Sequence, residues 1–169
     1  MARDFASFQA FAEFIKTRIG VAERAKHFGF DAGANMMAKA ARDMVGTEHE
    51  PWPSLADVTV TRKTAAGQTG RISSTDPLYA SGKLRDSWHY SVGNAGFVWG
   101  STDPVMVYHE HGTAKMPPRP VVGPVMFQHG KEVVSIAANW IMGAVAGHEG
   151  PLHPGEHAGS PLQAGAAAE

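Results

Sequence analysis

The stretch WHYSVGNAGFVWG, residues 88–100, decides the fold class that the sequence predicts. Trp88, Tyr90 and Val92 alternate with polar residues, and this period of two puts their side chains on one face of a strand. The sequence GNAG then supplies a turn, and residues 97–100 have the apolar and aromatic content of a second strand. The stretch therefore predicts an antiparallel hairpin with a half-buried face.

Upstream of the hairpin, the sequence has helical periodicity. Apolar residues recur at steps of three and four over residues 5–19 and again over residues 21–45, which places them on one side of a helix. Gly20 weakens the pattern between these segments, and Gly29 and Gly33 are candidate breaks or kinks. We therefore expect two N-terminal helices.

Downstream of the hairpin, we expect a third extended piece at residues 105–108 and then a C-terminal helix. Pro124 suits the first turn of that helix, and its apolar face runs to Gly147, where it should end. Residues 148–169 are rich in Gly, Pro and Ala and predict a flexible tail. The predicted fold class is α+β, with an antiparallel β-sheet packed against N-terminal and C-terminal helices.

A long extended loop is predicted between the N-terminal helices and the hairpin. Periodicity disappears over residues 46–79, where prolines and glycines interrupt every candidate element. Trp52 and Leu55 are expected to hold the beginning of this loop against the core, and a short turn or helix is expected at residues 81–86. The sequence predicts that residues 1–147, with this long loop included, form one domain.

The composition excludes several classes of protein. Hydrophobic residues make up 43 % and charged residues 18 % of the 169 residues, which predicts a folded domain rather than a disordered chain. The formal net charge of −1 argues against a protein whose main task is to neutralise phosphates. With no cysteine, disulfides and thiolate zinc sites are excluded, and no apolar run approaches the roughly 20 residues of a membrane span. We expect no membrane partner and no specific nucleic-acid binding.

Two histidines are the strongest candidate for chemistry. His109 and His111 flank Glu110, and on a strand both imidazoles would point to one face, as some metal sites require. They are only half a site, and the HExxH, GxSxG and GxxxxGK[ST] patterns are absent. We expect no catalytic, cofactor-binding or metal-ligating residue. A small metal-dependent hydrolase using the two histidines stays an alternative, as does a nucleic-acid module using the aromatic hairpin.

The sequence GTAKMPPRP, residues 112–120, is named the proline loop. Its three prolines restrict the backbone, and a restricted loop loses less entropy when it docks on another subunit. Arg119 is expected to form a bidentate contact with a carboxylate of that subunit. The alternative is that the loop only turns the chain from sheet to helix. The predicted subunit-interface residues are Gly112, Thr113, Met116, Pro117, Pro118, Arg119 and Pro120 of the proline loop, with Arg62, Lys63 and Arg71 of the long loop.

Four short motifs, taken in order, resemble the phage virion morphogenesis family, the tail completion proteins of Mu-like phages. The first is a W-x-x-L with a following T-x-x-x-K, the second a TGxLxxS element, the third a Y-A-x-x-H-x-x-G-like element and the fourth a PxRPF turn. The matching residues are Trp52, Leu55, Thr59 and Lys63; Ser81, Gly82, Leu84 and Ser87; Tyr108, His111, Gly112 and Thr113; and Met116, Pro117, Arg119 and Pro120. Ser81 replaces the usual threonine, and Val121 replaces the usual phenylalanine. The segment from Glu110 to Pro120 is also similar to the E-x-G-T-x-x-M-P-x-x-P turn of related head–tail joining (neck) proteins.

The resemblance implies a non-enzymatic structural protein of a tailed bacteriophage virion. It would act in the neck, at the head–tail junction, as a tail completion or tail terminator protein. A tail tube presents sixfold symmetry, so we expect a hexameric ring whose partners are other copies of the chain, other phage neck proteins and the tail tube. The alternative is a head-side adaptor or stopper protein that contacts the portal. The expected location is the virion neck or tail, and the host cytoplasm during assembly.

Overall fold

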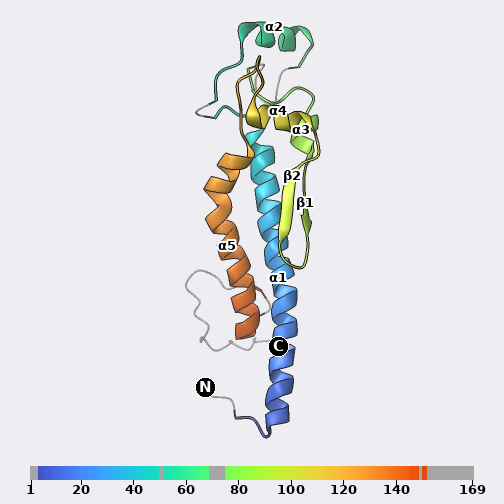
Figure 1. The fold of residues 1–169 in the computed structure, drawn as a ribbon, viewed down its shortest axis with the longest axis vertical. Helices are drawn as coiled ribbons and strands as arrows, with labels where there is room; N and C mark the ends of the chain where they lie inside the picture. The colour runs from blue at the N-terminus through green and yellow to red at the C-terminus, as the bar shows by residue number, and fades with distance from the viewer. Residues whose placement is uncertain (1–3, 50–51, 69–74, 149, 152–169) are drawn as a thin grey trace, which may run out of the picture. The chain divides into compact units, whose positions relative to one another are not determined.

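The computed structural model describes residues 4–49, 52–68, 75–148 and 150–151. The chain divides into two compact units, one formed by Met1–Gly33 and Glu132–Glu169 and the other by Ala34–Lys131. Figure 1 shows two long helices, α1 (Phe8–Met44) and α5 (Val122–Ala146). Each of them contributes residues to both units. The predicted α+β fold is confirmed, because the helices are accompanied by a two-stranded antiparallel sheet. No helix among the described residues is long and apolar enough to cross a membrane.

The first unit pairs the N-terminal part of α1 with the C-terminal part of α5. The two helices predicted at residues 5–19 and 21–45 are one continuous helix, so the expected breaks were wrong. A glycine inside a helix costs only about 1 kcal/mol, which packing can outweigh. At Gly29 the absence of a side chain allows α5 to approach α1 closely, since a Cβ there would lie 2.8 Å from the Cα of Ala137. Beside this contact, the rings of Phe28 and Trp140 lie 5.4 Å apart between centroids.

The second unit contains the hairpin. Strands β1 (Trp88–Val92) and β2 (Phe97–Ser101) pair antiparallel, with Tyr90 opposite Trp99, so the predicted hairpin is confirmed. Trp88 is fully buried and stacks on Trp99 at 5.7 Å between ring centroids, which leaves the Trp88 ring no free face for a nucleic-acid base. The guanidinium of Arg42 on α1 donates to the carbonyl oxygen of Trp88. The sheet therefore packs against α1 through the buried end of β1.

The described residues of the second unit also form three short helices: α2 (Asp57–Ala65), α3 (Lys83–Asp86) and α4 (Val105–His111). The helix expected at residues 81–86 is confirmed as α3. Helix α2 corrects the prediction that residues 46–79 are extended throughout. Asp57 in its first turn and Arg62 and Lys63 in its last turn complement the helix dipole. The sequence prediction gave more weight to the prolines and glycines of this region than to this charge pattern.

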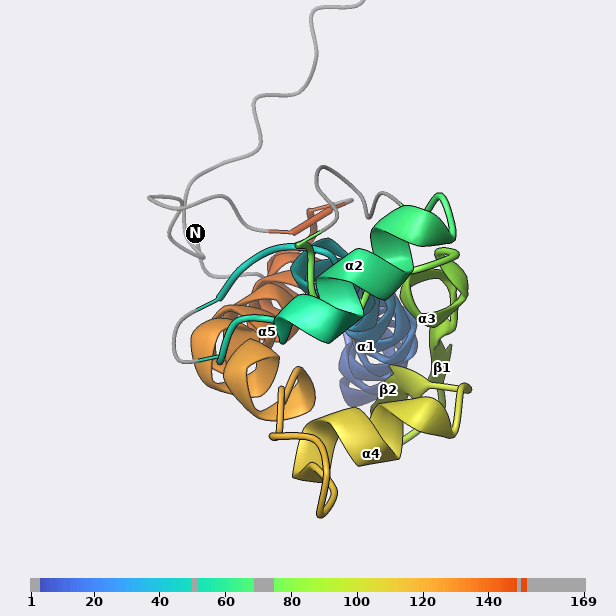
Figure 2. The ribbon, with the colours of Figure 1, turned by 90° about the horizontal axis from the view of Figure 1, so that it is seen from above.

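Helix α4 replaces the extended piece expected at residues 105–108. Its start is marked by Pro104, which suits the first turn of a helix, and by Asp103, whose Oδ1 accepts the N–H of Val105 at 2.9 Å. It ends at Gly112, which has a positive φ of 73°. Viewed from above, α2 and α4 lie across from each other in this unit (Figure 2).

Helix α5 ends as predicted, at Gly147, where φ is 95°. The flexible tail predicted for residues 148–169 lies almost entirely outside the described residues, as does Arg71.

Candidate functional site

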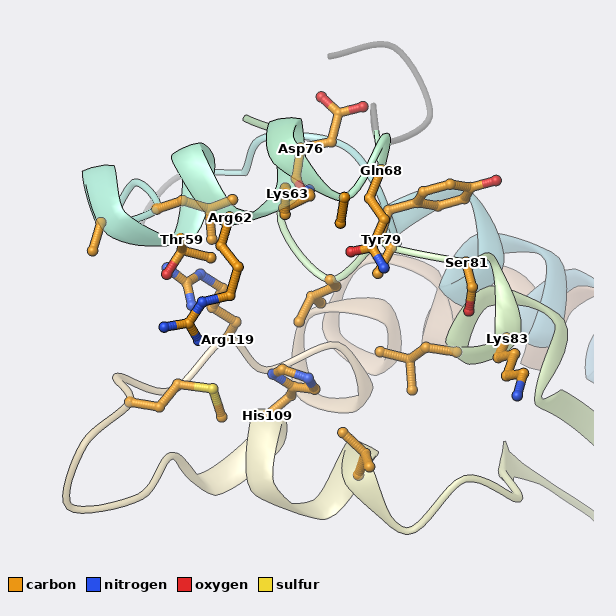
Figure 3. A pocket seen from close by; sticks show the side chains of 18 of the residues that line it. Thr59, Arg62, Lys63, Gln68, Asp76, Tyr79, Ser81, Lys83, His109 and Arg119 are labelled. Carbon is orange, nitrogen blue, oxygen red and sulfur yellow. The ribbon is translucent and has the colours of Figure 1, made fainter. Parts of the chain in front are cut away.

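The second unit contains a cavity of about 1140 Å³, lined by residues of four chain segments. These segments are α2 with the residues just before and after it, residues 76–84, α4 with Asp103, and the proline loop. Figure 3 shows α2 and α4 on opposite sides of the cavity, with the side chain of His109 rising from α4 toward α2. The lining of the cavity therefore comes from parts of the chain that are more than 60 residues apart in sequence, such as Ser54 and Arg119.

The proline loop folds back on α4 through backbone contacts. Thr113 donates its N–H to the Met116 carbonyl at 2.8 Å and accepts the Met116 N–H at 3.2 Å, which closes a tight turn. The N–H of Arg119 then donates to the His109 carbonyl at 2.7 Å. Gly112 starts the turn with φ 73° and ψ 178°, a region that is essentially restricted to glycine. A Cβ at this position would lie 2.9 Å from the nitrogen of Pro118, so a side chain is also excluded by space.

Arg119 connects the proline loop to the segment before α2. Its Nη2 donates to the carbonyl oxygens of Pro53 at 2.8 Å and Ser54 at 3.2 Å, and its Nε donates to Pro53 at 3.3 Å. The residue is 5 % exposed, and burial lowers the pKa of its guanidinium. Nε and Nη2 of Arg119 are thus bonded inside the chain, whereas its expected contact with a carboxylate of a neighbouring subunit stays a prediction. Its charge faces carbonyl oxygens rather than a carboxylate.

Lys63 has a similar internal role on the other side of α2. Its Nζ donates to the backbone carbonyl of Asp76 at 2.6 Å, and the residue is 8 % exposed. Burial lowers the pKa of Lys63, and the negative charge of Asp76 partly opposes this shift. Lys63 thus fixes α2 to the last residues of the predicted long loop. The neighbouring Arg62 is exposed and lines the cavity.

The two histidines flanking Glu110 do not share a face. They lie on helix α4, and residues two apart on a helix are separated by about 200° around its axis. His109 is half-buried in the cavity wall, whereas His111 is exposed. The expected pairing of the two imidazoles on a strand was therefore wrong. Among the described residues, no group of three or more His, Cys, Asp or Glu could hold a metal ion.

His109 has an unusual environment within this wall. Its Nδ1 is buried and has no hydrogen-bond partner among the residues that the structure describes. Burial lowers the pKa of the imidazole, the positive charge of Arg119 lowers it further, and Asp103 opposes the shift. The ring is therefore held neutral at neutral pH.

Glu110 caps the N-terminus of α5 across the proline loop. Its Oε2 accepts the N–H groups of Val121 at 2.8 Å and Val122 at 3.1 Å, and its Oε1 accepts that of Gly123 at 3.3 Å. The next residue, Pro124, has no N–H, and Val125 makes the first regular helical bond to Val121 at 3.1 Å. Every backbone donor at this helix end thus has a partner. The sequence contained no local signal for this cap, because its partners lie 11 to 13 residues away.

The cavity gathers half of the predicted interface residues. Met116, Pro117, Arg119, Arg62 and Lys63 line it, whereas Gly112, Thr113, Pro118 and Pro120 lie outside the lining and Arg71 lies outside the described residues. Sequence reasoning singled out His109 only as half of a metal site, and it missed several other polar lining residues because no short pattern links them; these are Asp57, Gln68, Asp76, Tyr79, Lys83, Asp103 and Lys115.

Three of the four short motifs described in the sequence contribute residues to this cavity. The first supplies Leu55, Thr59 and Lys63, the second Ser81, Gly82 and Leu84, and the fourth Met116, Pro117 and Arg119. The residues of the third motif lie outside the lining. No family model matches this chain, and no curated protein or solved structure shows significant similarity to it.

Proposed function

We propose that this chain is a structural subunit of a tailed-phage virion, and that it acts without catalysis as a tail completion or tail terminator protein in the neck. The observation that carries the proposal is that three of the four motifs converge on one cavity. Arg119 and Lys63, which belong to two of these motifs, hold its walls together by hydrogen bonds to backbone carbonyls. A set of residues matching family motifs therefore has a common physical role in this fold.

The exposed apolar side chains of the second unit support a role in assembly. Phe127 on α5 is 91 % exposed, and Val107 and Tyr108 on α4 are 59 % and 58 % exposed. Contiguous patches of exposed apolar side chains mark surfaces that bind other proteins, and aromatic residues are enriched in such interfaces. In a head-to-tail ring each subunit offers one such surface to its neighbour, and sixfold closure would match the tail tube.

The proposal is tested by locating the subunit in the purified phage particle by cryo-electron microscopy. We expect a ring of six copies at the head–tail junction. A ring on the head side, against the portal, would instead favour the adaptor or stopper role. Absence of the chain from the particle would overturn the proposal, and so would turnover of a small substrate that one histidine substitution abolishes.

A matched pair of variants tests the surface at α5. Phage lacking this coding sequence would be complemented with the wild type, Phe127→Asp or Gln128→Glu. Residue 128 is exposed on the same helix, so its variant adds a charge without removing an apolar side chain. We expect Phe127→Asp to leave unjoined heads and tails, and Gln128→Glu to restore infectious particles. Equal infectivity of the two variants would exclude Phe127 from the assembly interface.

Light scattering on the isolated protein adds a second measurement. We expect a monomer, or an association that depends on concentration, because the ring forms on its partners in the particle. A permanent dimer that does not dissociate on dilution would contradict the ring.

A further inference from the structure

The cavity between α2 and α4 carries more positive than negative charge. Arg62, Lys63, Lys83, Lys115 and Arg119 line it, against three aspartates. This excess contrasts with the chain as a whole, which has 15 basic and 16 acidic residues. A concave site with apolar walls strengthens the field of the charges that line it, so the cavity is suited to an anionic partner.

Three of these cations are not used by the fold. Lys63 and Arg119 are buried and bonded to backbone carbonyls, but Arg62, Lys83 and Lys115 are exposed. None of these three forms an ion pair with a residue that the structure describes. In Figure 3, Arg62 lies at one end of the cavity and Lys83 at the other. An anionic partner could thus contact two separate cations, Arg62 and Lys83.

The lining also contains apolar side chains. The lining includes Leu55, Leu78, Leu84, Val105 and Met116. A volume of about 1140 Å³ lies above the range of roughly 300–1,000 Å³ usual for small-molecule sites. A single inorganic anion would leave most of this lining uncovered. A nucleic-acid backbone would place a charge at every residue and leave the apolar lining without a matching surface.

We propose that this cavity binds an acidic segment of another protein, with carboxylates at the Arg62 and Lys83 ends and apolar side chains between them. His109 lies in the cavity wall and offers a neutral imidazole to the backbone of that segment. The inference rests on the proposed function only for the source of the segment, which would be a neighbouring subunit or neck protein. The walls are held in place by the internal bonds of Lys63 and Arg119, so the site is formed before the partner arrives.

The test uses the full chain and a short fluorescein-labelled peptide in which leucines separate two glutamates. We expect saturable binding by fluorescence anisotropy, and weakening of at least about tenfold, equivalent to about 1.4 kcal/mol, in the double variant Arg62→Glu/Lys83→Glu. Arg24→Glu is the matched control, because Arg24 is exposed in the other unit and does not line the cavity. It should bind the peptide as the wild type does. Circular dichroism would establish that each variant is folded.

Further outcomes decide the identity of the occupant. The imidazole resonances of His109 should shift on titration with the acidic peptide, which places the peptide in this cavity. Equal affinity for a peptide with lysines in place of the glutamates would overturn the proposal. Full displacement by millimolar inorganic phosphate, or by a single-stranded oligonucleotide, would also overturn it in favour of a simple anion site or a nucleic-acid site. Peptide binding without virion incorporation would remove the phage role and leave the cavity proposal standing.

Discussion

Removal of the Glu110 carboxylate should destabilise the start of α5. In Glu110→Ala the N–H groups of Val121, Val122 and Gly123 lose their acceptor together. Loss of a helix N-cap costs about 0.5–2 kcal/mol. Val121 is fully buried, so its N–H cannot turn to water, and an unsatisfied buried donor costs about 1–3 kcal/mol. We expect a total loss of about 2–4 kcal/mol.

Glu110→Gln separates the charge from the hydrogen bonds. The glutamine carbonyl keeps one acceptor, which can take the two N–H groups now bonded to Oε2. The negative charge at the positive end of the α5 dipole is lost, and so is the bond to Gly123. We expect a loss of about 1 kcal/mol, between the wild type and the alanine variant.

The free energy of unfolding is measured by urea titration followed by circular dichroism, with hydrogen exchange at Val121 as a local readout. For a chain of this size each kcal/mol corresponds to about 2–4 °C in Tm, so Glu110→Ala should melt roughly 5–15 °C lower. Glu48→Ala is the control, because Glu48 is exposed and its side chain forms none of the described salt bridges. A Glu110→Ala variant within about 0.5 kcal/mol of the wild type would refute the reasoning, since only surface substitutions away from such contacts have so small an effect.

Three further predictions concern single positions. Gly112→Ala should cost about 1–3 kcal/mol in a urea titration, because the backbone conformation there is essentially restricted to glycine; an unchanged midpoint would contradict this. Gly29→Ala should destabilise by about 1–3 kcal/mol, since its Cβ would lie 2.8 Å from the Cα of Ala137. Gly20→Ala on the same helix has open space and should stabilise by about 0.5–1 kcal/mol; thermal melts in which both variants are more stable than the wild type would show that the close helix contact is absent. The lowered pKa of His109 means that the unfolded chain takes up the proton first as pH falls. The free energy of unfolding of the wild type, minus that of His109→Gln, should therefore be largest above about pH 6.5 and should decrease as pH falls through the lower folded pKa of His109. A difference that is constant from about pH 8 to about pH 5 would contradict the assignment.

Local patterns in the sequence were sufficient for the hairpin and for the extent of α5. Alternation at Trp88 and Tyr90 depends only on the period of a strand, and the ends of α5 depend on Pro124 and Gly147, whose backbone preferences act within one turn. The same kind of reasoning failed at Gly29, where a local propensity was outweighed by contact with a distant helix.

The cavity and the cap of α5 were decided only by the tertiary structure. Arg119 meets Pro53 and Ser54 across more than 60 residues, and Glu110 reaches Val121 across a loop. The sequence marked the proline loop as stiff, but it could not show whether Arg119 points outward to a partner or inward to the chain. Residue type and spacing determine which conformations the backbone prefers locally, whereas the partner of a long charged side chain depends on which distant carbonyls the fold brings within reach.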